Sequence, residues 1–299
     1  MMKEIIKVAL LQTKSSDSIE ENEKKTIEFI KEAKSKGANI VSTKELFKTK
    51  YFPQIESWDY FKFAESIDKN SQTIKKYQDI AKQLNIVLIL SLFEKRADGI
   101  YHNTAVVIDA DGNYLGKYRK MHIPDDPHFY EKFYFTPGDT GYRVFNTKFG
   151  KIGVLICWDQ WFPEAARITA MKGAKIIFYP TAIGWLPSEK NLYGDSQYNA
   201  WETIQRSHAV ANGIYIASIN RVGFEESPDG DEGIQFWGKS FVSNPYGEVI
   251  NQASQDKEEI LITDIDLSVI DETRITWPFF RDRRIDSYKD IEKRWLEDE

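Results

Sequence analysis

Cys157 is the first candidate for chemistry, because it is the only cysteine in the chain. It follows the apolar run 152–156 and precedes a short elbow and a helical pattern. Strand ends in open α/β sheets are where ligands bind, and a thiol there can face a crevice in which a cation or helix N-terminus favours the thiolate. Free cysteine is also among the most buried residue types, so position alone favours an inert core thiol.

A thiolate that attacks an amide needs a base to move protons, and a donor or cation to hold the developing oxyanion. Histidine is the usual base, but none of the four histidines has a spacing that singles it out. His122 and His128 lie six residues apart, which is not a familiar spacing for metal ligands. The sequence therefore identifies no histidine base, and we expect no zinc site.

Two predicted strand ends offer other charged groups. Glu45 follows the predicted strand 39–43, and Lys120 follows the predicted strand 114–118. An acid, a cation and a thiol could therefore meet at one sheet edge. Taken singly, Glu45 and Lys120 are expected on the solvated surface, because Glu and Lys are seldom buried. Spacing alone does not lift either residue above that expectation.

The elements that would position these residues follow an alternation of β-rich and helical runs. In the charged segment 18–36, Ile27, Ile30 and Ala33 form one apolar stripe, which is typical of an amphipathic helix. Each half of the chain can bury one sheet face under helices and its other sheet face against the other half, which predicts an α/β fold with four layers, αββα. The predicted strands are 5–11, 39–43, 86–92, 114–118, 152–156, 175–179 and 214–219. The predicted helices are 18–36, 71–84, 163–172 and 196–212. A hairpin turn is predicted at 109–113, and loops at 121–139 and 185–197.

The composition favours one continuous domain. The chain has 299 residues, 41% of them hydrophobic, and no Pro-rich linker, low-complexity tract or long run of like charge divides it. We predict a single domain over residues 1–299, with residues 271–299 as a C-terminal extension. That extension carries the apolar run 277–280 beside a cluster of arginines, so we expect it to pack either on its own subunit or at an oligomer interface.

Charge and cysteine content limit the setting and the partners. The net charge of −6 comes from 40 basic and 46 acidic residues that are finely mixed, which argues against nucleic-acid binding. One cysteine cannot form an internal disulfide, and the N-terminus lacks the apolar core of a signal peptide, so we expect a cytoplasmic protein. No apolar run approaches the roughly 20 residues that span a bilayer, and we expect no membrane segment.

Three segments together resemble the motif blocks of the nitrilase, or carbon-nitrogen hydrolase, superfamily. They are Lys44-Glu45-Leu46-Phe47, Tyr118-Arg119-Lys120-Met121-His122-Ile123-Pro124 and Gly153-Val154-Leu155-Ile156-Cys157-Trp158-Asp159. Their order and separations also match, and the similarity runs from about residue 5 to residue 267. The resemblance implies an αββα sandwich with a Glu-Lys-Cys triad, which agrees with the layers predicted above.

Carried over position by position, the resemblance implies that Glu45 is the general base, Lys120 the cation beside the oxyanion and Cys157 the nucleophile. Glu131 matches a second glutamate, which in this superfamily helps to position the substrate and the lysine. The backbone N–H of Trp158 would complete an oxyanion hole with Lys120. No metal or organic cofactor enters this mechanism.

The chain departs from the superfamily pattern at Lys44, where proline usually precedes the catalytic glutamate. Neighbouring side chains in an extended segment point to opposite faces. We therefore expect Lys44 to point away from the site if Glu45 points into it. A lysine that pointed into the site would weaken Glu45 as a base, because it would stabilise the charged carboxylate.

Within the superfamily, the stretches 122–125, 131–139, 157–164 and 180–184 most resemble the N-carbamoylputrescine amidase branch. The resemblance implies a small-molecule substrate, N-carbamoylputrescine. Its ureido group would be cleaved to give putrescine, carbon dioxide and ammonia, a step in making polyamines from arginine through agmatine.

The chain departs from that branch at Trp185-Leu186-Pro187, which replaces a Ser-Glu-Pro whose glutamate lies near the distal amine of the substrate. A cationic tail still needs a counter-charge or an aromatic face. Lys190 is the only cation between residues 183 and 200, so this region favours an amine over a carboxylate. The candidates for the contact with the amine are Asp125, Trp185, Glu189, Tyr193 and Asp195.

Two alternatives remain open at this point. An amidase of the same chemistry could act on N-carbamoyl-β-alanine, on another carbamoyl amino acid or on an ω-amide. A catalytically silent scaffold or binding protein could also retain this fold, with Cys157 unmodified by any substrate. In either case the resemblance implies a homo-oligomer, without fixing the number of subunits.

Overall fold

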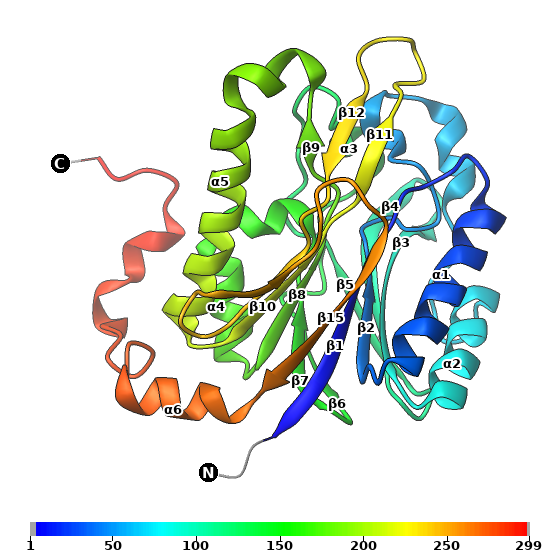
Figure 1. Ribbon diagram of the computed structural model, residues 1–299. Coiled ribbons are helices and arrows are strands. Elements are labelled where there is room, and N and C mark those ends of the chain that lie inside the picture. The colour runs from blue at the N-terminus through cyan, green and yellow to red at the C-terminus, as the bar shows by residue number, and fades with distance from the viewer. Residues whose placement is uncertain (1–3, 298–299) are drawn as a thin grey trace.

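The computed structural model describes residues 4–297, in which two six-stranded sheets lie face to face between pairs of helices (Figure 1). Helices α1 (Ile19–Ser35) and α2 (Gln72–Leu84) cover the outer face of the first sheet. Helices α4 (Pro163–Met171) and α5 (Pro187–Asn212) cover the outer face of the second. The predicted αββα sandwich is therefore confirmed.

The first sheet has the strand order β15-β1-β2-β3-β4-β5. Strands β1, β2 and β3 are parallel, because helices α1 and α2 connect them, whereas β15, β4 and β5 are antiparallel to their neighbours. The strands are β1 (Ile5–Gln12), β2 (Ile40–Thr43), β3 (Val87–Ala97), β4 (Ile100–Ile108), β5 (Tyr114–Arg119) and β15 (Glu259–Asp266).

The second sheet has the order β14-β13-β10-β8-β7-β6, and a small third sheet, β11-β12-β9, extends from one end of the sandwich. Two further helices are α3 (Glu131–Tyr134) and α6 (Ser268–Thr276). The strands are β6 (Val144–Thr147), β7 (Gly150–Val154), β8 (Ile176–Pro180), β9 (Gly184–Trp185), β10 (Tyr215–Ile219), β11 (Val222–Glu225), β12 (Ile234–Trp237), β13 (Phe241–Ser243) and β14 (Val249–Gln252).

Strand β1 shows why the central strands are apolar at nearly every position. Val8 and Leu10 belong to the core between the two sheets, whereas Ala9 and Leu11 belong to the core under α1 and α2. Successive side chains on a strand point to opposite faces, so a strand in the middle of four layers must be apolar on both. Strand β1 therefore contributes to two cores, and the site lies at one end of the core between the sheets.

Two predicted loops are wrong in part. The predicted loop 121–139 contains the short helix α3 (Glu131–Tyr134). The predicted loop 185–197 is β9 followed by the first turns of α5, which begins at Pro187 and not near residue 196. Pro187 stands at the first helical position, where a proline is favourable. Gly194 lies inside the helix and is buried, and a Cβ atom there would lie 3.2 Å from Nε1 of Trp185. No helix within residues 4–297 is long and apolar enough to cross a membrane.

The C-terminal segment packs on its own chain at Phe280. This ring lies under the guanidinium groups of Arg167 on α4 and Arg274 on α6, 5.4 and 4.7 Å from its centroid. Beyond it, most of the side chains are exposed, including Ile285 and Trp295. Packing on its own subunit, one of the two predicted possibilities, therefore accounts for Phe280 but not for these exposed apolar groups.

Glu94 on β3 binds side chains at the end of β5, the strand that precedes Lys120. Its carboxylate accepts two hydrogen bonds of 2.8 Å from Arg119 and one of 2.7 Å from Thr104, and it also pairs with Lys117. Burial alone would raise the pKa of Glu94, but these donors outweigh it and lower the pKa from 4.5 to about 2. The charged form is therefore stabilised by folding.

We expect Glu94→Gln to lower the free energy of unfolding by about 3 kcal/mol at neutral pH, measured by urea denaturation. Because the pKa is lower in the folded state, this stabilisation is complete above the usual value of 4.5 and is lost as the pH falls towards 2. The difference between the variant and the wild type should shrink over that range. Asp264→Asn, which removes an exposed partner of Lys7, is the control and should cost less than about 1 kcal/mol.

Candidate active site

Lys120 lies between two carboxylates at one end of the inner core. Its Nζ is 2.9 Å from Oε1 of Glu45 and 2.6 Å from Oε2 of Glu131, and all three side chains are fully buried. Glu45 follows β2, Lys120 follows β5, and Glu131 begins α3. Three elements that are distant in sequence therefore bring one ammonium and two carboxylates together.

These charges act strongly on one another because all three side chains are buried away from bulk solvent. Burial alone would lower the pKa of the Lys120 ammonium, but Glu131 and Glu45 outweigh it and hold that pKa above its usual value. Burial raises the pKa of Glu131, against the opposing effect of Lys120. Lys120 is thus a permanent cation, and the group can take up a proton on a carboxylate.

The two oxygens of Glu45 have different surroundings. Oε1 accepts hydrogen bonds from Lys120 and, at 2.7 Å, from Nδ2 of Asn103. Oε2 is buried and has no hydrogen-bond partner among residues 4–297. A buried acceptor without a partner costs free energy, and at a candidate active site it marks a position that can take a proton. Glu45 is therefore oriented by one oxygen and available through the other.

Cys157 stands at a sharp turn between β7 and a 3₁₀ turn, Cys157–Trp161, with a positive φ of 43°. Positive φ is uncommon for residues other than glycine and is often found at functional sites. Sγ makes only a weak contact, 3.8 Å, with the carbonyl oxygen of Ala182. Cys157 is 5% exposed and lines a pocket.

Burial, and next Glu45, raise the pKa of the Cys157 thiol well above its usual value, and Lys120 only partly opposes them. The thiolate favoured from the sequence is therefore not the resting form. A buried thiol flanked by carboxylates keeps its proton until a base accepts it. Attack by Cys157 must accompany transfer of that proton, and Glu45 has the free oxygen to receive it.

Asp159 holds the turn that presents Cys157. Its Oδ2 accepts from the N–H of Ile156 at 2.9 Å and the hydroxyl of Tyr118 at 2.7 Å. Its Oδ1 accepts from the N–H of His122 at 3.1 Å and lies 2.7 Å from the ring nitrogen Nδ1. This fully buried carboxylate links the turn to the segment that carries Lys120.

The pocket above Cys157 has a volume of about 330 Å³ and is lined mainly by apolar and aromatic groups. Trp158 and Glu189, two of the predicted substrate contacts, are among its lining residues. Glu189 lies on the first turn of α5, where Gln197 donates to its Oε2 at 3.0 Å. Asp126 also lines the pocket. Asp125, which is a predicted substrate contact, does not.

The other predicted substrate contacts lie outside the residues that line this pocket. Trp185 is buried, packs on the ring of Trp237 and donates to the carbonyl of Gly194 at 2.9 Å, so it serves as core. Tyr193 is 57% exposed. Asp195 is exposed. It lies six residues after Glu189 on α5, which in an α-helix places it on a different face of the helix from Glu189.

Lys44 points away from the carboxylate of Glu45, as expected. Its Nζ donates to the carbonyl of Thr13 at 2.8 Å and to the hydroxyl of Ser15 at 2.7 Å, and the side chain is buried. Burial, and next the neighbouring Arg221, lower the pKa of this amine well below its usual value. Lys44 therefore adds no ammonium beside the free oxygen of Glu45.

Sequence reasoning missed Asn103, Tyr51 and Asp159. The signal for Asn103 was a polar run, His102-Asn103-Thr104, inside an otherwise apolar strand. The hydroxyl of Tyr51 donates to Glu131 at 2.7 Å, and nothing in the sequence around Tyr51 indicates that contact. Asp159 lies within one of the three motif blocks, and its sequence context indicates no contact with Tyr118 or His122.

A buried thiol, a lysine ammonium and two carboxylates at the end of an αββα sandwich are the groups of a thiol-dependent hydrolase of amide-like bonds. The family comparison agrees with this class. The chain belongs to the carbon-nitrogen hydrolase family, whose model matches residues 7–275.

Individual relatives match over nearly the whole chain. An N-carbamoylputrescine amidase of Arabidopsis thaliana is 47% identical over 94% of this chain and 93% of its own length. A citrullinase of Francisella tularensis subsp. tularensis is 40% identical over 97% of this chain and 99% of its own length. The crystal structure of a carbon-nitrogen hydrolase from Helicobacter pylori G27 is 48% identical, with a TM-score of 0.93, and the match covers 98% of this chain and 100% of that chain.

Proposed function

We propose that this protein hydrolyses N-carbamoylputrescine to putrescine, carbon dioxide and ammonia. The observation that carries the proposal is the pocket, which holds Cys157 and the carboxylate of Glu189 within one cavity. Two acids, Asp126 and Glu189, and no lysine or arginine within residues 4–297 line it, so it offers anions for a cationic tail and no cation for a carboxylate. Similarity to N-carbamoylputrescine amidases at 43–47% identity supports the same substrate.

In the first half of the proposed reaction, Sγ of Cys157 forms a bond to the ureido carbon while its proton passes to Oε2 of Glu45. Lys120 and the N–H of Trp158 hold the oxyanion that develops. Ammonia leaves with the proton from Glu45, and a thiocarbamate that carries the putrescine arm remains on Cys157. The hydrogen bond from Asn103 keeps Glu45 oriented throughout.

In the second half, Glu45 takes a proton from water, and the oxygen of that water forms a bond to the thiocarbamate carbon. The carbon–sulfur bond breaks, and the proton returns from Glu45 to the sulfur of Cys157. The product is a carbamate of putrescine, which decomposes to putrescine and carbon dioxide. Glu131 would hold the Lys120 ammonium in place during both halves, through its contact of 2.6 Å.

An ammonia-release assay on a substrate panel tests this proposal. The panel holds N-carbamoylputrescine, N-carbamoyl-β-alanine, citrulline and an ω-amide. We expect the highest kcat/KM for N-carbamoylputrescine. Faster turnover of a carbamoyl amino acid would favour the second candidate, for which the 40% identity to a citrullinase is the supporting observation. Ammonia release from none of them would favour a silent scaffold.

Glu189 is proposed to hold the distal ammonium of the substrate. We expect Glu189→Gln to raise KM for N-carbamoylputrescine by about 10- to 100-fold, because a charge-assisted hydrogen bond contributes about 1.5–3 kcal/mol. The value of kcat should change little, since the reacting carbon lies at the other end of the substrate. Steady-state kinetics measure both constants.

Asp195→Asn is the matched control for Glu189→Gln, because Asp195 is an exposed acid on the same helix. It should leave KM within about twofold of the wild type. An equal rise in KM for both variants would show that the overall field of the helix, and not Glu189 itself, attracts the substrate.

We further propose that residues 1–299 form one domain in a cytoplasmic homo-oligomer that has no nucleic-acid partner. Exposed apolar side chains on and after α6 support self-association, because such groups are enriched at interfaces. They are Ile275, Trp277, Phe279, Ile285, Ile291 and Trp295. The net charge of −6 supports the absence of a nucleic-acid partner.

A further inference from the structure

The turn that follows β2 carries two residues that contact the group around Lys120. Glu45 stands at its start and bonds to Lys120 directly, whereas Tyr51 stands at its end and donates to Glu131. Residues 45–51, called the β2 turn below, therefore set the positions of both carboxylates beside Lys120. Leu46 within this turn has a positive φ of 47°, which is costly for a residue with a branched side chain.

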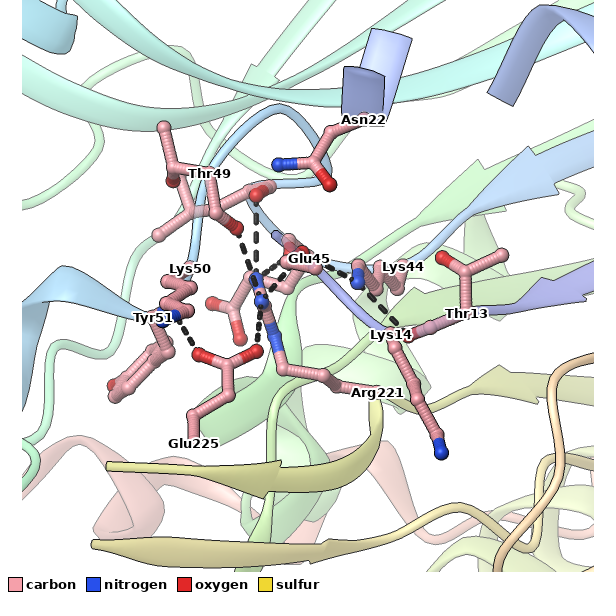
Figure 2. A network of polar contacts seen from close by, with 12 residues as sticks. Thr13, Lys14, Asn22, Lys44, Glu45, Thr49, Lys50, Tyr51, Arg221 and Glu225 are labelled. Carbon is pink, nitrogen blue, oxygen red and sulfur yellow. Dashed lines mark hydrogen bonds and ion pairs between the residues drawn. The ribbon is translucent and has the colours of Figure 1, made fainter. Parts of the chain in front are cut away.

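Arg221, which follows β10, binds three backbone carbonyls of the β2 turn. Its Nη2 donates to the carbonyls of Glu45 at 3.0 Å and Leu46 at 3.2 Å, and its Nη1 donates to the carbonyl of Thr49 at 3.0 Å. Figure 2 shows the guanidinium group inserted between the turn and Glu225. Arg221 is fully buried, so water does not compete for these bonds.

Glu225 completes the contact with the β2 turn. One of its oxygens accepts from Nη1 of Arg221 at 2.7 Å, and the other accepts from the backbone N–H of Tyr51 at 2.6 Å. Both bonds are drawn in Figure 2. The pair thus holds the start of the turn through Arg221 and its end through Glu225, from which Tyr51 reaches Glu131.

The chemistry of the guanidinium suits this contact better than that of an ammonium. The donors of a guanidinium form a rigid planar fork. Arg221 can therefore bind several carbonyls of the turn and still keep its contact with the carboxylate of Glu225. Lys44 provides a useful contrast. It is an equally buried amine that shares the hydroxyl of Ser15 with Arg221, yet its hydrogen bonds go to Thr13 and Ser15, outside the β2 turn.

We infer that Arg221, paired with Glu225, is a positioning residue that fixes the β2 turn and thereby aims Glu45 at Cys157 and Glu131 at Lys120. The inference rests on the proposed function only in the roles of Glu45 and Glu131. It extends the site beyond the residues that meet the substrate, to a buried ion pair on the chain segment between β10 and the end of β11.

Arg221→Lys tests the inference, because it keeps the charge beside Glu225 and removes the fork. We expect kcat to fall about 10- to 100-fold, since a displacement of about 1 Å in a reacting group has an effect of that size, while KM stays within about threefold. Lys44→Met is the matched control for loss of a buried amine. It should lower the melting temperature but leave kcat within about threefold of the wild type.

Alkylation of Cys157 by iodoacetamide provides a second measurement that needs no natural substrate. Cys157 is the only cysteine, so the rate reports on this thiol alone. The rate should fall in Arg221→Lys, because Glu45 would no longer be placed to accept the thiol proton, and it should be unchanged in Lys44→Met. If the wild type alkylates readily but releases no ammonia from N-carbamoylputrescine, the proposed substrate fails while this inference is still tested.

Three results would overturn the inference. They are a kcat and an alkylation rate in Arg221→Lys equal to those of the wild type, equal losses in Arg221→Lys and Lys44→Met, and losses that follow the melting temperature alone. If Arg221→Lys does not fold, Tyr51→Phe decides, because it removes only the hydroxyl that donates to Glu131. A fall in kcat of at least about fivefold supports the inference, and an unchanged kcat overturns it.

Discussion

Cys157→Ala should lower kcat for N-carbamoylputrescine by at least about 10,000-fold, the scale expected when a covalent nucleophile is removed. The variant should fold normally, because Sγ makes no short hydrogen bond and the change removes one small buried group. It should also still bind the substrate, since the remaining pocket walls, including Glu189, are unchanged. Ammonia release and calorimetric titration measure the two effects separately.

Cys157→Ser is the companion variant for this prediction. Its hydroxyl is a weaker nucleophile than the thiol and should restore little of the lost turnover. A Cys157→Ala protein that retains more than about 1% of the wild-type kcat would contradict the assignment of the nucleophile. It would place the reaction on water or on another side chain of the pocket.

Glu45→Gln should lower kcat by about 100- to 10,000-fold and leave KM within a few-fold of the wild type. The amide oxygen of glutamine can still accept from Asn103 and Lys120, but its NH₂ group replaces Oε2, the oxygen without a partner. The geometry is thus kept while the proton acceptor is lost. Steady-state kinetics at neutral pH provide the measurement.

Glu94→Gln is the control for Glu45→Gln, because Glu94 is also buried on the first sheet but lies outside the site. It should reduce stability and leave the kcat of the folded protein within about threefold of the wild type. If Glu45→Gln were as active as Glu94→Gln, Glu45 would be a structural carboxylate and another group would move the proton.

The sequence predicts the layers of this fold well, because hydrophobic periodicity distinguishes central strands from outer helices. It fails at α5, where Gly194 lies inside the helix and packs closely against the indole of Trp185. That contact depends on tertiary packing and leaves no local pattern. The helix therefore begins about nine residues before the start that the sequence pattern predicts.

The resemblance to a family supplied Glu45, Lys120 and Cys157, whose positions along the chain are far apart. The residues that orient them were not predictable in the same way. Asn103 reaches Glu45 because β4 pairs with β3, the neighbour of β2, in one antiparallel register that sets Asn103 opposite Phe93. Such a contact is set by the alignment of two strands and not by the type of either residue.

Side-chain contacts with distant backbone atoms are even less predictable from the sequence. Arg221 binds the carbonyl of Glu45, 176 residues away in sequence. A buried arginine is rare, but a sequence does not reveal that a particular arginine will be buried. The same holds for Asp159, whose acceptors serve backbone and side-chain donors from two different segments.

Acid quenching followed by intact-mass measurement tests most directly whether Cys157 performs covalent hydrolysis of a ureido substrate. The protein is mixed with N-carbamoylputrescine, quenched within the first turnover and weighed, and the adduct is located by peptide mapping. We expect a mass increase equal to the substrate minus one ammonia, on Cys157 alone, which disappears as putrescine is released. Ammonia and putrescine formed without any adduct on Cys157 at any quench time would contradict the covalent mechanism.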